Sequence, residues 1–357
     1  MPLSTDTLAR LSDVNASPRA AGVLVTTEVP QQKTAWTKAR QDVQDITRAQ
    51  AWDTLAMPAG LSPWEWRGFF AQLSRRLGEG GSVLVEYPFE QRRRIYPLFT
   101  WCRLRGVRLH GLIHDLHTLR FGAAQGREVA ILRLFDGLIS HNPVMTEWLR
   151  AAGLSKPLVD LHLFDYLLQA PQPATWHAEA LSAPLKVLCA GNLSHPKARY
   201  IYDPRLGELS GVELSLYGAF FEPERMPASP VRYKGVFEAD APVLDGRYHF
   251  GLVWDGESAQ GVEGHYGHYM RYNNPHKVSL YMALGLPVVV WQEAAVARFV
   301  LDQGVGVAIA DLRELGQVAT RLNPAAYARM TAQVRRVRTQ VMQGHFLSQA
   351  LQALQEA

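Results

Sequence analysis

The sequence predicts an α/β protein with two Rossmann-like domains, whose parallel sheets face each other across a central cleft. Short apolar runs alternate with helical patterns along the chain, which favours right-handed strand–helix–strand units and parallel sheets. The pattern restarts after a segment at 171–184 that is rich in proline and alanine. The length of 357 residues is sufficient for two domains.

Apolar runs mark the expected strands in both halves of the chain. They lie at 22–25, 82–86, 107–113, 136–140 and 158–161, and again at 186–190, 212–216, 249–253, 287–291 and 305–309. Helical patterns cover 33–48, 145–152 and the tail from 324. We therefore expect an N-terminal domain at 1–170, a linker at 171–184, a C-terminal domain at 185–340 and a terminal helix at 341–357 that packs back on the N-terminal domain.

The composition is that of an ordinary globular protein, with 47% apolar and 20% charged residues. A net charge of +4 suits anionic ligands or an anionic membrane surface, and it is too weak to indicate nucleic acid binding. Cys102 and Cys189 lie in apolar surroundings and are expected to be buried thiols. No signal peptide or apolar run of membrane-spanning length is visible. We expect a cytoplasmic address, the inner membrane face included, and leave the oligomeric state open, a homo-oligomer included.

The stretch 271–291 carries the clearest functional pattern. Asn274 is expected to cap a helix that has Pro275 at its first position and ends at Gly285. The N-terminus of such a helix directs N–H groups and the positive end of its dipole at whatever lies in front of it, which favours phosphate. Lys277 adds a full positive charge at the same end. A well-capped helix with a solvated lysine is the alternative interpretation.

Several motifs give the chain a family resemblance. They are IHDLHTLR (113–120), FDGLISHNPVM (135–145), LFDY (163–166), CAGNLS (189–194), FGLVWDG (250–256) and, above all, RYNNPHKVSLYMALGLPVVVW (271–291). With these motifs the chain resembles the bacterial glycosyltransferases that include β-1,6-galactofuranosyltransferases and streptococcal adhesin glucosyltransferases. The resemblance implies a GT-B fold, a nucleotide-sugar donor (usually with UDP) in the C-terminal domain, and a sugar acceptor that faces the N-terminal domain.

Donor-binding candidates lie mainly after strands of the second half. They are Asn192, Lys197, Tyr217, Glu263, Tyr272, Asn273, Asn274, Pro275, His276 and Lys277. A simple turn at Asn192, core packing of Tyr217 and a solvated carboxylate at Glu263 are the alternatives. The glycine-rich run 261–270 is expected to form a mobile loop. Its residues Glu263, His265 and His268 lack a second cluster of ligands, so we expect no metal site and no cofactor besides the donor.

The N-terminal half supplies candidates for the acceptor side of the cleft. Asp115 ends a strand after His114, where its carboxylate is placed to take the proton of an acceptor hydroxyl. A structural carboxylate that caps a turn is the alternative. The further cleft candidates are Thr26, Thr27, Lys33 and Arg120.

A basic and aromatic stretch at 87–108 admits two interpretations. Most charge runs are solvated faces. The sharper hypothesis is docking to an anionic membrane that carries a lipid-linked acceptor.

The leading hypothesis is a glycosyltransferase that moves a hexosyl unit, with galactofuranose or glucose favoured, from a UDP-sugar to a cell-surface glycan without a metal ion. A transferase that modifies a protein adhesin, and a non-catalytic nucleotide-sugar-binding partner of another transferase, are the alternatives. A dinucleotide-dependent oxidoreductase is disfavoured, because no G-x-G-x-x-G follows the first expected strand.

Overall fold

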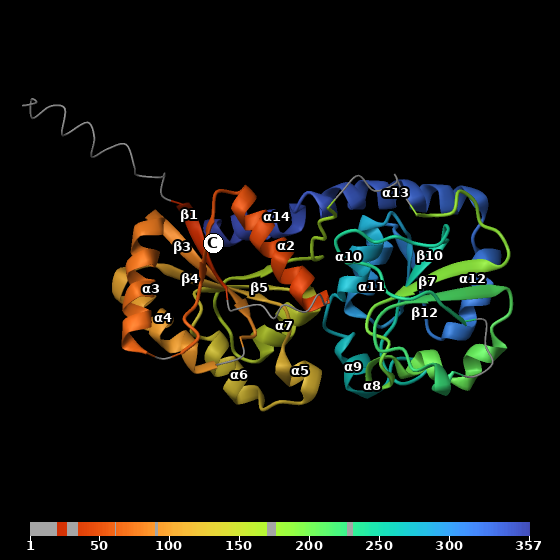
Figure 1. Ribbon diagram of the computed structural model, residues 1–357, viewed down its shortest axis with the longest axis horizontal. Coiled ribbons are helices and arrows are strands. Elements are labelled where there is room, and N and C mark those ends of the chain that lie inside the picture. Colours follow the sequence, from red (N-terminus) through yellow and green to blue (C-terminus); the bar gives the residue numbers. More distant parts are fainter. Residues whose placement is uncertain (1–19, 27–34, 61, 90–91, 170–175, 227–230) are drawn as a thin grey trace, which may run out of the picture.

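The computed structural model describes residues 20–26, 35–60, 62–89, 92–169, 176–226 and 231–357. It consists of two α/β domains side by side along the long axis of the molecule (Figure 1). Each domain contains a six-stranded parallel sheet, which confirms the predicted fold class. Two cleft candidates, Thr27 and Lys33, lie outside the described residues.

The N-terminal sheet has the strand order β2-β1-β3-β4-β5-β6. Its strands are β1 (Ala20–Thr26), β2 (Asp53–Ala56), β3 (Leu77–Tyr87), β4 (Arg108–Ile113), β5 (Gly137–Ser140) and β6 (Leu158–Asp160). Its helices are α2 (Ala35–Ala49), α3 (Pro63–Arg76), η1 (Arg92–Arg94), α4 (Ile95–Arg105), α5 (His117–Phe121), α6 (Gln125–Leu132) and α7 (Pro143–Ala151). Strand side chains alternate between two apolar layers, because successive residues of a strand point to opposite faces of the sheet: Leu24 joins one core and Val23 and Val25 join the other.

The C-terminal sheet has the order β12-β11-β10-β7-β8-β9. Its strands are β7 (Leu185–Ala190), β8 (Val212–Tyr217), β9 (Val231–Tyr233), β10 (Phe250–Val253), β11 (Val288–Trp291) and β12 (Gly306–Ile309). Its helices are α8 (His195–Ala198), η2 (Arg199–Tyr202), η3 (Pro204–Glu208), η4 (Pro223–Arg225), α9 (Gly264–Tyr269), α10 (His276–Ala283), α11 (Ala295–Asp302), η5 (Leu312–Glu314), α12 (Leu315–Arg321) and α13 (Pro324–Met342). In the described part of the chain, no helix combines the length and apolar character that a membrane span needs.

The last helix, α14 (His345–Glu356), leaves the C-terminal domain and lies on the N-terminal one (Figure 1). It contacts α2, β5 and β6, and Ser348 accepts a hydrogen bond from Gln50 at 2.5 Å. Asp165 accepts hydrogen bonds from the backbone N–H groups of Phe346 (3.2 Å) and Leu347 (2.8 Å) at the start of this helix. A carboxylate in this position satisfies helical N–H groups that have no partner within the helix.

A buried polar bridge joins the two domains beside α10. The Asn274 side chain is 2% exposed and donates to the carbonyl oxygens of His141 (2.6 Å) and His162 (2.8 Å). Its Oδ1 accepts from Asn142 Nδ2 at 2.7 Å. Asn142 Nδ2 also donates to the carbonyl oxygen of Tyr272 at 2.9 Å. We call these five residues the Asn142–Asn274 bridge; every polar atom of the buried Asn274 amide takes part in it.

This bridge corrects one prediction about the helix start. Helix α10 begins at His276, with Pro275 at the N-cap position and no side-chain capping hydrogen bond. Asn274, the predicted cap, lies one residue before the N-cap position. Its side chain is hydrogen-bonded to the N-terminal domain instead. Three buried interdomain hydrogen bonds outcompete one capping hydrogen bond, because each buried polar group would cost free energy if it were left unpaired.

We predict that Asn274→Asp destabilises the protein by about 3 kcal/mol, because a carboxylate cannot donate to the carbonyl oxygens of His141 and His162. Urea unfolding measures the loss. Asn192→Asp is the matched control, since the exposed Asn192 side chain accepts from the Ser194 N–H, which a carboxylate does equally well. Equal effects of the two substitutions would contradict the assignment.

His141 makes the interface sensitive to acid. Its Nδ1 accepts from the backbone N–H of Asn274 (3.0 Å) and its Nε2 lies 3.1 Å from the carbonyl oxygen of Ile113. Burial lowers the pKa of His141 to about 4. An unfolded histidine has a pKa of about 6.5, so the unfolded state binds more protons between these values, and protonation favours unfolding.

We therefore expect the stabilising contribution of His141 to be complete above about pH 6.5 and to be lost as the pH falls towards 4, a change of about 3 kcal/mol. The measurement is the difference in unfolding free energy between the wild type and His141→Gln as a function of pH. A difference that does not change across this window would refute the assignment.

Candidate active site

The candidate site lies where the carboxyl ends of both sheets meet, the place where α/β proteins commonly bind ligands. β4 ends before His114 and Asp115, β7 ends before Gly191, and β10 ends before Asp255. Helix α10 begins at the same place, on the side of the C-terminal domain that faces the N-terminal domain (Figure 1).

Tyr281 holds α10 against the C-terminal sheet. Its hydroxyl donates to the carbonyl oxygen of Leu252 (3.1 Å) and accepts from the backbone N–H of Ala190 (2.8 Å). Its ring packs on Gly251, where a Cβ atom would lie 2.3 Å from the ring. Strand β10 needs glycine here, because only a residue without a side chain lets the helix approach this closely.

Lys277 and Asp255 form an ion pair at the centre of the site. Lys277 Nζ donates to Asp255 Oδ1 (2.8 Å) and to the carbonyl oxygen of Trp254 (2.7 Å), and both charged side chains are nearly buried. Burial opposes the charged form of Lys277, yet Asp255 outweighs it and the pKa of Lys277 lies above its usual value. Burial likewise opposes ionisation of Asp255, yet Lys277 and Lys197 hold the pKa of Asp255 below its usual value.

Two further cations complete the cluster, one from each domain. Lys197 Nζ lies 5.8 Å from the centre of the Tyr266 ring, and the guanidinium carbon of Arg120 lies 5.6 Å from the same ring. Asp255 raises the pKa of Lys197, but burial, Lys277 and Arg120 together outweigh it and lower that pKa. Burial is the largest of the causes that lower this pKa, and the two neighbouring cations add to it, an arrangement that favours an anion.

Asp115 lies on the N-terminal side of this cluster. Its carboxylate forms a salt bridge with Arg120 and is partly exposed. It also acts on the buried Tyr269, whose pKa is raised first by burial and then by Asp115. The Tyr269 hydroxyl accepts from the backbone N–H of Leu116 at 3.2 Å, so this tyrosine of the C-terminal domain reaches the loop that carries Asp115.

The cluster of Arg120, Lys197 and Lys277 with Asp115 and Asp255 is suited to diphosphate chemistry. Cations fixed in a nearly buried site stabilise charge that develops on a leaving group, and they do so without reorganisation at the moment of reaction. The Asp115 carboxylate, partly exposed beside them, is available to accept a proton.

His114, the neighbour of Asp115, has a different setting. Its Nε2 lies 2.9 Å from Glu86 Oε1, and its ring stacks on Phe164 with centroids 5.5 Å apart. Glu86 is also paired with the buried Arg40. His114 therefore belongs to a buried network with Glu86, Arg40 and Phe164, apart from the charged cluster.

His276 stacks on Phe164 with ring centroids 4.4 Å apart. Burial lowers the pKa of His276 to about 3, so the imidazole is neutral at neutral pH. Its Nδ1 is buried and has no hydrogen-bond partner among the described residues, and the same holds for Asn273 Oδ1. These two buried atoms lie at or just before the start of α10.

Other predicted residues lie apart from the cluster. Tyr217 is buried, and its hydroxyl accepts from the backbone N–H of Asp245 at 2.8 Å. This setting agrees with core packing, the alternative to donor binding. Glu263 is exposed at the start of α9 and Asn192 is exposed in a turn. Thr26 is buried at the end of β1. Tyr272 belongs to the Asn142–Asn274 bridge through its carbonyl oxygen, and Pro275 follows the bridge as the N-cap residue of α10.

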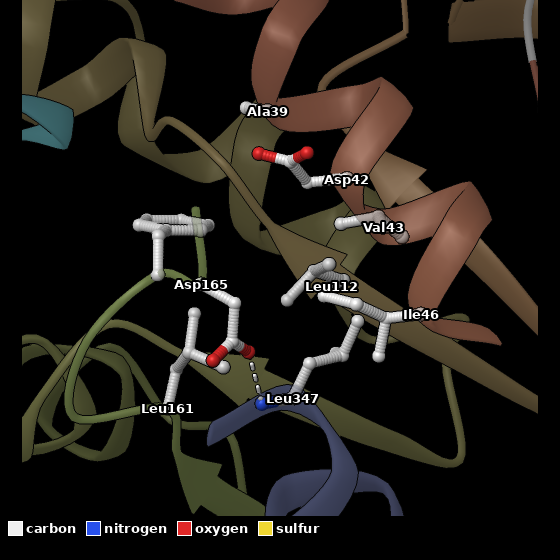
Figure 2. Close-up of a pocket in the computed structure, with 9 residues that line it drawn as sticks. Ala39, Asp42, Val43, Ile46, Leu112, Leu161, Asp165 and Leu347 are labelled. Atoms are coloured by element: carbon white, nitrogen blue, oxygen red, sulfur yellow. Dashed lines mark hydrogen bonds between the residues drawn. The ribbon is translucent and has the colours of Figure 1, made fainter. Parts of the chain in front are cut away.

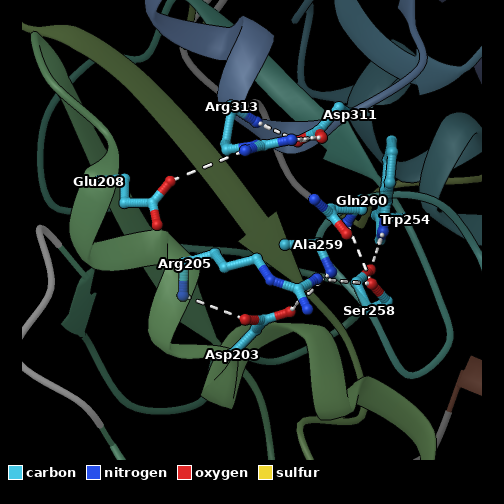
Figure 3. A network of polar contacts seen from close by, with 9 residues as sticks. All are labelled: Asp203, Arg205, Glu208, Trp254, Ser258, Ala259, Gln260, Asp311 and Arg313. Carbon is cyan, nitrogen blue, oxygen red and sulfur yellow. Dashed lines mark hydrogen bonds and ion pairs between the residues drawn. The ribbon is translucent and has the colours of Figure 1, made fainter.

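The segment predicted as a mobile loop is structured. Residues 264–269 form α9, and hydrogen bonds to neighbouring segments hold the preceding loop (Figure 3). Asp203 accepts from the Ala259 N–H at 3.1 Å, and the Trp254 indole donates to the carbonyl oxygen of Ser258 at 3.1 Å. The glycines mark close backbone approaches here rather than flexibility: a Cβ atom at Gly256 would lie 2.5 Å from the carbonyl oxygen of Glu263. The position of Asp255 is thereby fixed.

A small cavity lies in the N-terminal domain between α2, β4 and α14 (Figure 2). The cavity has room for about one water molecule and is too small for a sugar. Asp42 Oδ2 is buried and without a hydrogen-bond partner among the described residues, and burial raises the pKa of Asp42 to about 7 despite Lys38. The cavity is therefore not the substrate site.

Sequence reasoning missed Asp255 and Tyr266 as members of the site. Asp255 follows a buried strand, the same signal that identified Asp115. Tyr266 gave no such signal, since its role depends on α9 lying against α5. Within the described ranges, no group of three or more His, Cys, Asp or Glu side chains is placed to hold a metal ion.

Comparison with known proteins adds independent evidence. Residues 23–163 match the glucosyltransferase 3-like N-terminal domain, and residues 187–354 match the glucosyltransferase 3-like C-terminal domain. The β-1,6-galactofuranosyltransferase WbbI of Escherichia coli (strain K12) is 32% identical over 253 residues, which cover 70% of this chain and 72% of that protein. Glucosyltransferase 3 of Streptococcus gordonii is 24% identical over 300 residues, which cover 79% of this chain and 83% of that protein.

The fold is also found among solved structures. Sucrose-phosphate synthase from Thermosynechococcus elongatus superposes with a TM-score of 0.56 at 15% identity, over 93% of this chain and 97% of that chain. The two family matches together span most of the chain, and one relative is more than 30% identical. Both findings agree with the GT-B architecture described above. The chain belongs to the glucosyltransferase 3-like family and is a glycosyltransferase of GT-B fold.

Proposed function

We propose that this glycosyltransferase transfers a hexosyl unit, galactofuranose or glucose, from a UDP-sugar to a glycan acceptor of the cell surface. The observation that carries the proposal is the cluster of Arg120, Lys197 and Lys277 at the carboxyl ends of both sheets. These cations match the negative charge of a nucleoside diphosphate. The choice of sugar follows the two relatives, a galactofuranosyltransferase and a glucosyltransferase.

The proposed mechanism divides the work between the domains. Lys277, Lys197 and Arg120 bind the diphosphate and neutralise its charge as the bond to the sugar breaks. Asp115, which is paired with Arg120, takes the proton of the attacking acceptor hydroxyl. Because side chains supply the positive charge, the proposed reaction needs no metal ion. When the diphosphate binds Arg120, it competes with Asp115 for this partner, which frees the carboxylate for proton transfer.

We predict that Lys277→Met weakens UDP binding about tenfold or more, because it removes a nearly buried charge from the diphosphate site. Calorimetry with UDP gives the affinity, and a thermal melt shows whether the variant folds. Lys277→Arg keeps the charge and should recover part of the affinity. Lys186→Met, at an exposed position of β7, is the control. Wild-type affinity in a folded Lys277→Met protein would refute the assignment.

Turnover of UDP-hexoses with a panel of glycan acceptors tests the function itself. We expect product formation in excess EDTA, and a fall of about a hundredfold or more in Asp115→Asn, whose amide cannot accept a proton. UDP affinity in that variant should be at least that of the wild type, because the amide no longer competes with the diphosphate for Arg120. Asp136→Asn, which alters a carboxylate beside Arg103 and Lys156, is the control. Activity that EDTA abolishes and magnesium or manganese restores would overturn the metal-free mechanism; full activity of Asp115→Asn would overturn the base.

A further inference from the structure

The outer side of the N-terminal domain carries a surface that the proposed chemistry does not use. Helices α3 and α4 lie side by side there (Figure 1). Phe70 and Trp101, one from each helix, stack with centroids 5.4 Å apart and planes nearly parallel, and so join the helices. We call the outer faces of these helices the α3–α4 surface; it consists of Trp64, Arg67, Phe70, Tyr96, Phe99, Trp101, Arg103, Leu104 and Arg105.

Large apolar side chains are exposed on this surface. Trp64 is 77% exposed, Tyr96 is 50% exposed and Leu104 is 81% exposed. Single exposed apolar residues are common on proteins, whereas several on two adjoining helices are a candidate for an interaction site. Tryptophan and tyrosine are the residues that favour the boundary between water and lipid, because their rings are apolar and their edges are polar.

Arginines accompany the aromatic rings. The guanidinium carbons of Arg67, Arg103 and Arg105 lie 6.0, 5.3 and 5.9 Å from the ring centres of Trp64, Phe99 and Trp101. The α4 sequence has no acidic residue, and the α3 sequence has one, Glu65. Arg103 is also paired with Asp136 at 3.7 Å, so Arg67 and Arg105 supply most of the positive charge. Positive charge beside exposed apolar groups complements a layer of anionic headgroups over acyl chains.

The position of the surface fits an acceptor carried in a membrane. Helices α3 and α4 follow β2 and β3, so both begin at the carboxyl edge of the parallel sheet, where Asp115 also lies. Trp64 and Tyr96 occupy these first turns. A second copy of the chain fits less well, because a symmetric contact would place the arginines of one surface against those of the other.

We propose that the α3–α4 surface docks the protein on an anionic lipid bilayer, with Trp64, Tyr96 and Leu104 at the headgroup level and the arginines against lipid phosphates. Docking would place the acceptor side of the cleft beside a lipid-linked glycan. Its purpose therefore rests on the proposed function. The lipid contact itself requires neither UDP nor turnover.

Co-sedimentation with vesicles tests the proposal. We expect binding to phosphatidylcholine vesicles that contain phosphatidylglycerol, weaker binding to pure phosphatidylcholine, and release by salt. The double variant Arg67→Glu with Leu104→Glu should lose about tenfold or more in affinity for the anionic vesicles. The matched control is Arg298→Glu with Leu301→Glu, which makes the same changes at exposed positions of α11 in the C-terminal domain and should bind as the wild type does.

Equal binding to both kinds of vesicle, or equal losses in the two double variants, would overturn the proposal. So would a dimer seen by analytical ultracentrifugation that the Arg67→Glu, Leu104→Glu variant dissociates, because the surface would then serve a second copy. Thermal melts of both variants show that they fold. UDP calorimetry separates the two proposals: a protein that binds anionic vesicles and not UDP keeps the docking surface and loses the proposed function.

Discussion

The whole arrangement depends on one buried amide. Asn274 belongs to the segment that leads into α10, yet its side chain is bonded entirely to the N-terminal domain. The helix that carries Lys277 is therefore attached to both domains. Tyr281 binds it to the C-terminal sheet, and Asn274 binds its start to the N-terminal domain. A movement of one domain relative to the other must either break these hydrogen bonds or move the start of α10. The position of Lys277 and the position of the two domains are thus mechanically linked.

The charges of the cleft follow a second constraint. Three cations gathered at one point repel each other, and burial makes that repulsion stronger. Asp255 relieves it from the C-terminal side and Asp115 from the N-terminal side. The two carboxylates have different surroundings. Asp255 is paired with Lys277 and follows a strand whose next loop is hydrogen-bonded to Asp203, whereas Asp115 is paired with Arg120 of its own domain. In the proposed mechanism Asp255 stays paired with Lys277, while the diphosphate takes the place of Asp115 beside Arg120.

Much of the fold could be predicted from local pattern, because central strands are continuous apolar runs between turn residues. The edge strands β2 and β9 were missed, since the sequences DTLA and VRY carry no such run and pair on one side only. Lys277 could be placed in the site because helix starts and strand ends are local signals. The role of Asn274 could not, since its partners His141, Asn142 and His162 are more than a hundred residues away. The same applies to Tyr217, whose burial depends on Asp245 and Phe237.

The return of α14 to the first domain bears on how the chain is made. The last strand of the N-terminal sheet, β6, ends at Asp160, but the helix that covers one face of this sheet begins at His345. During synthesis the ribosome must therefore produce the entire C-terminal domain before α14 arrives to pack against α2, β5 and β6. Until then an apolar layer of the nascent N-terminal domain stays uncovered, a natural binding site for chaperones. The domain that begins first is completed last.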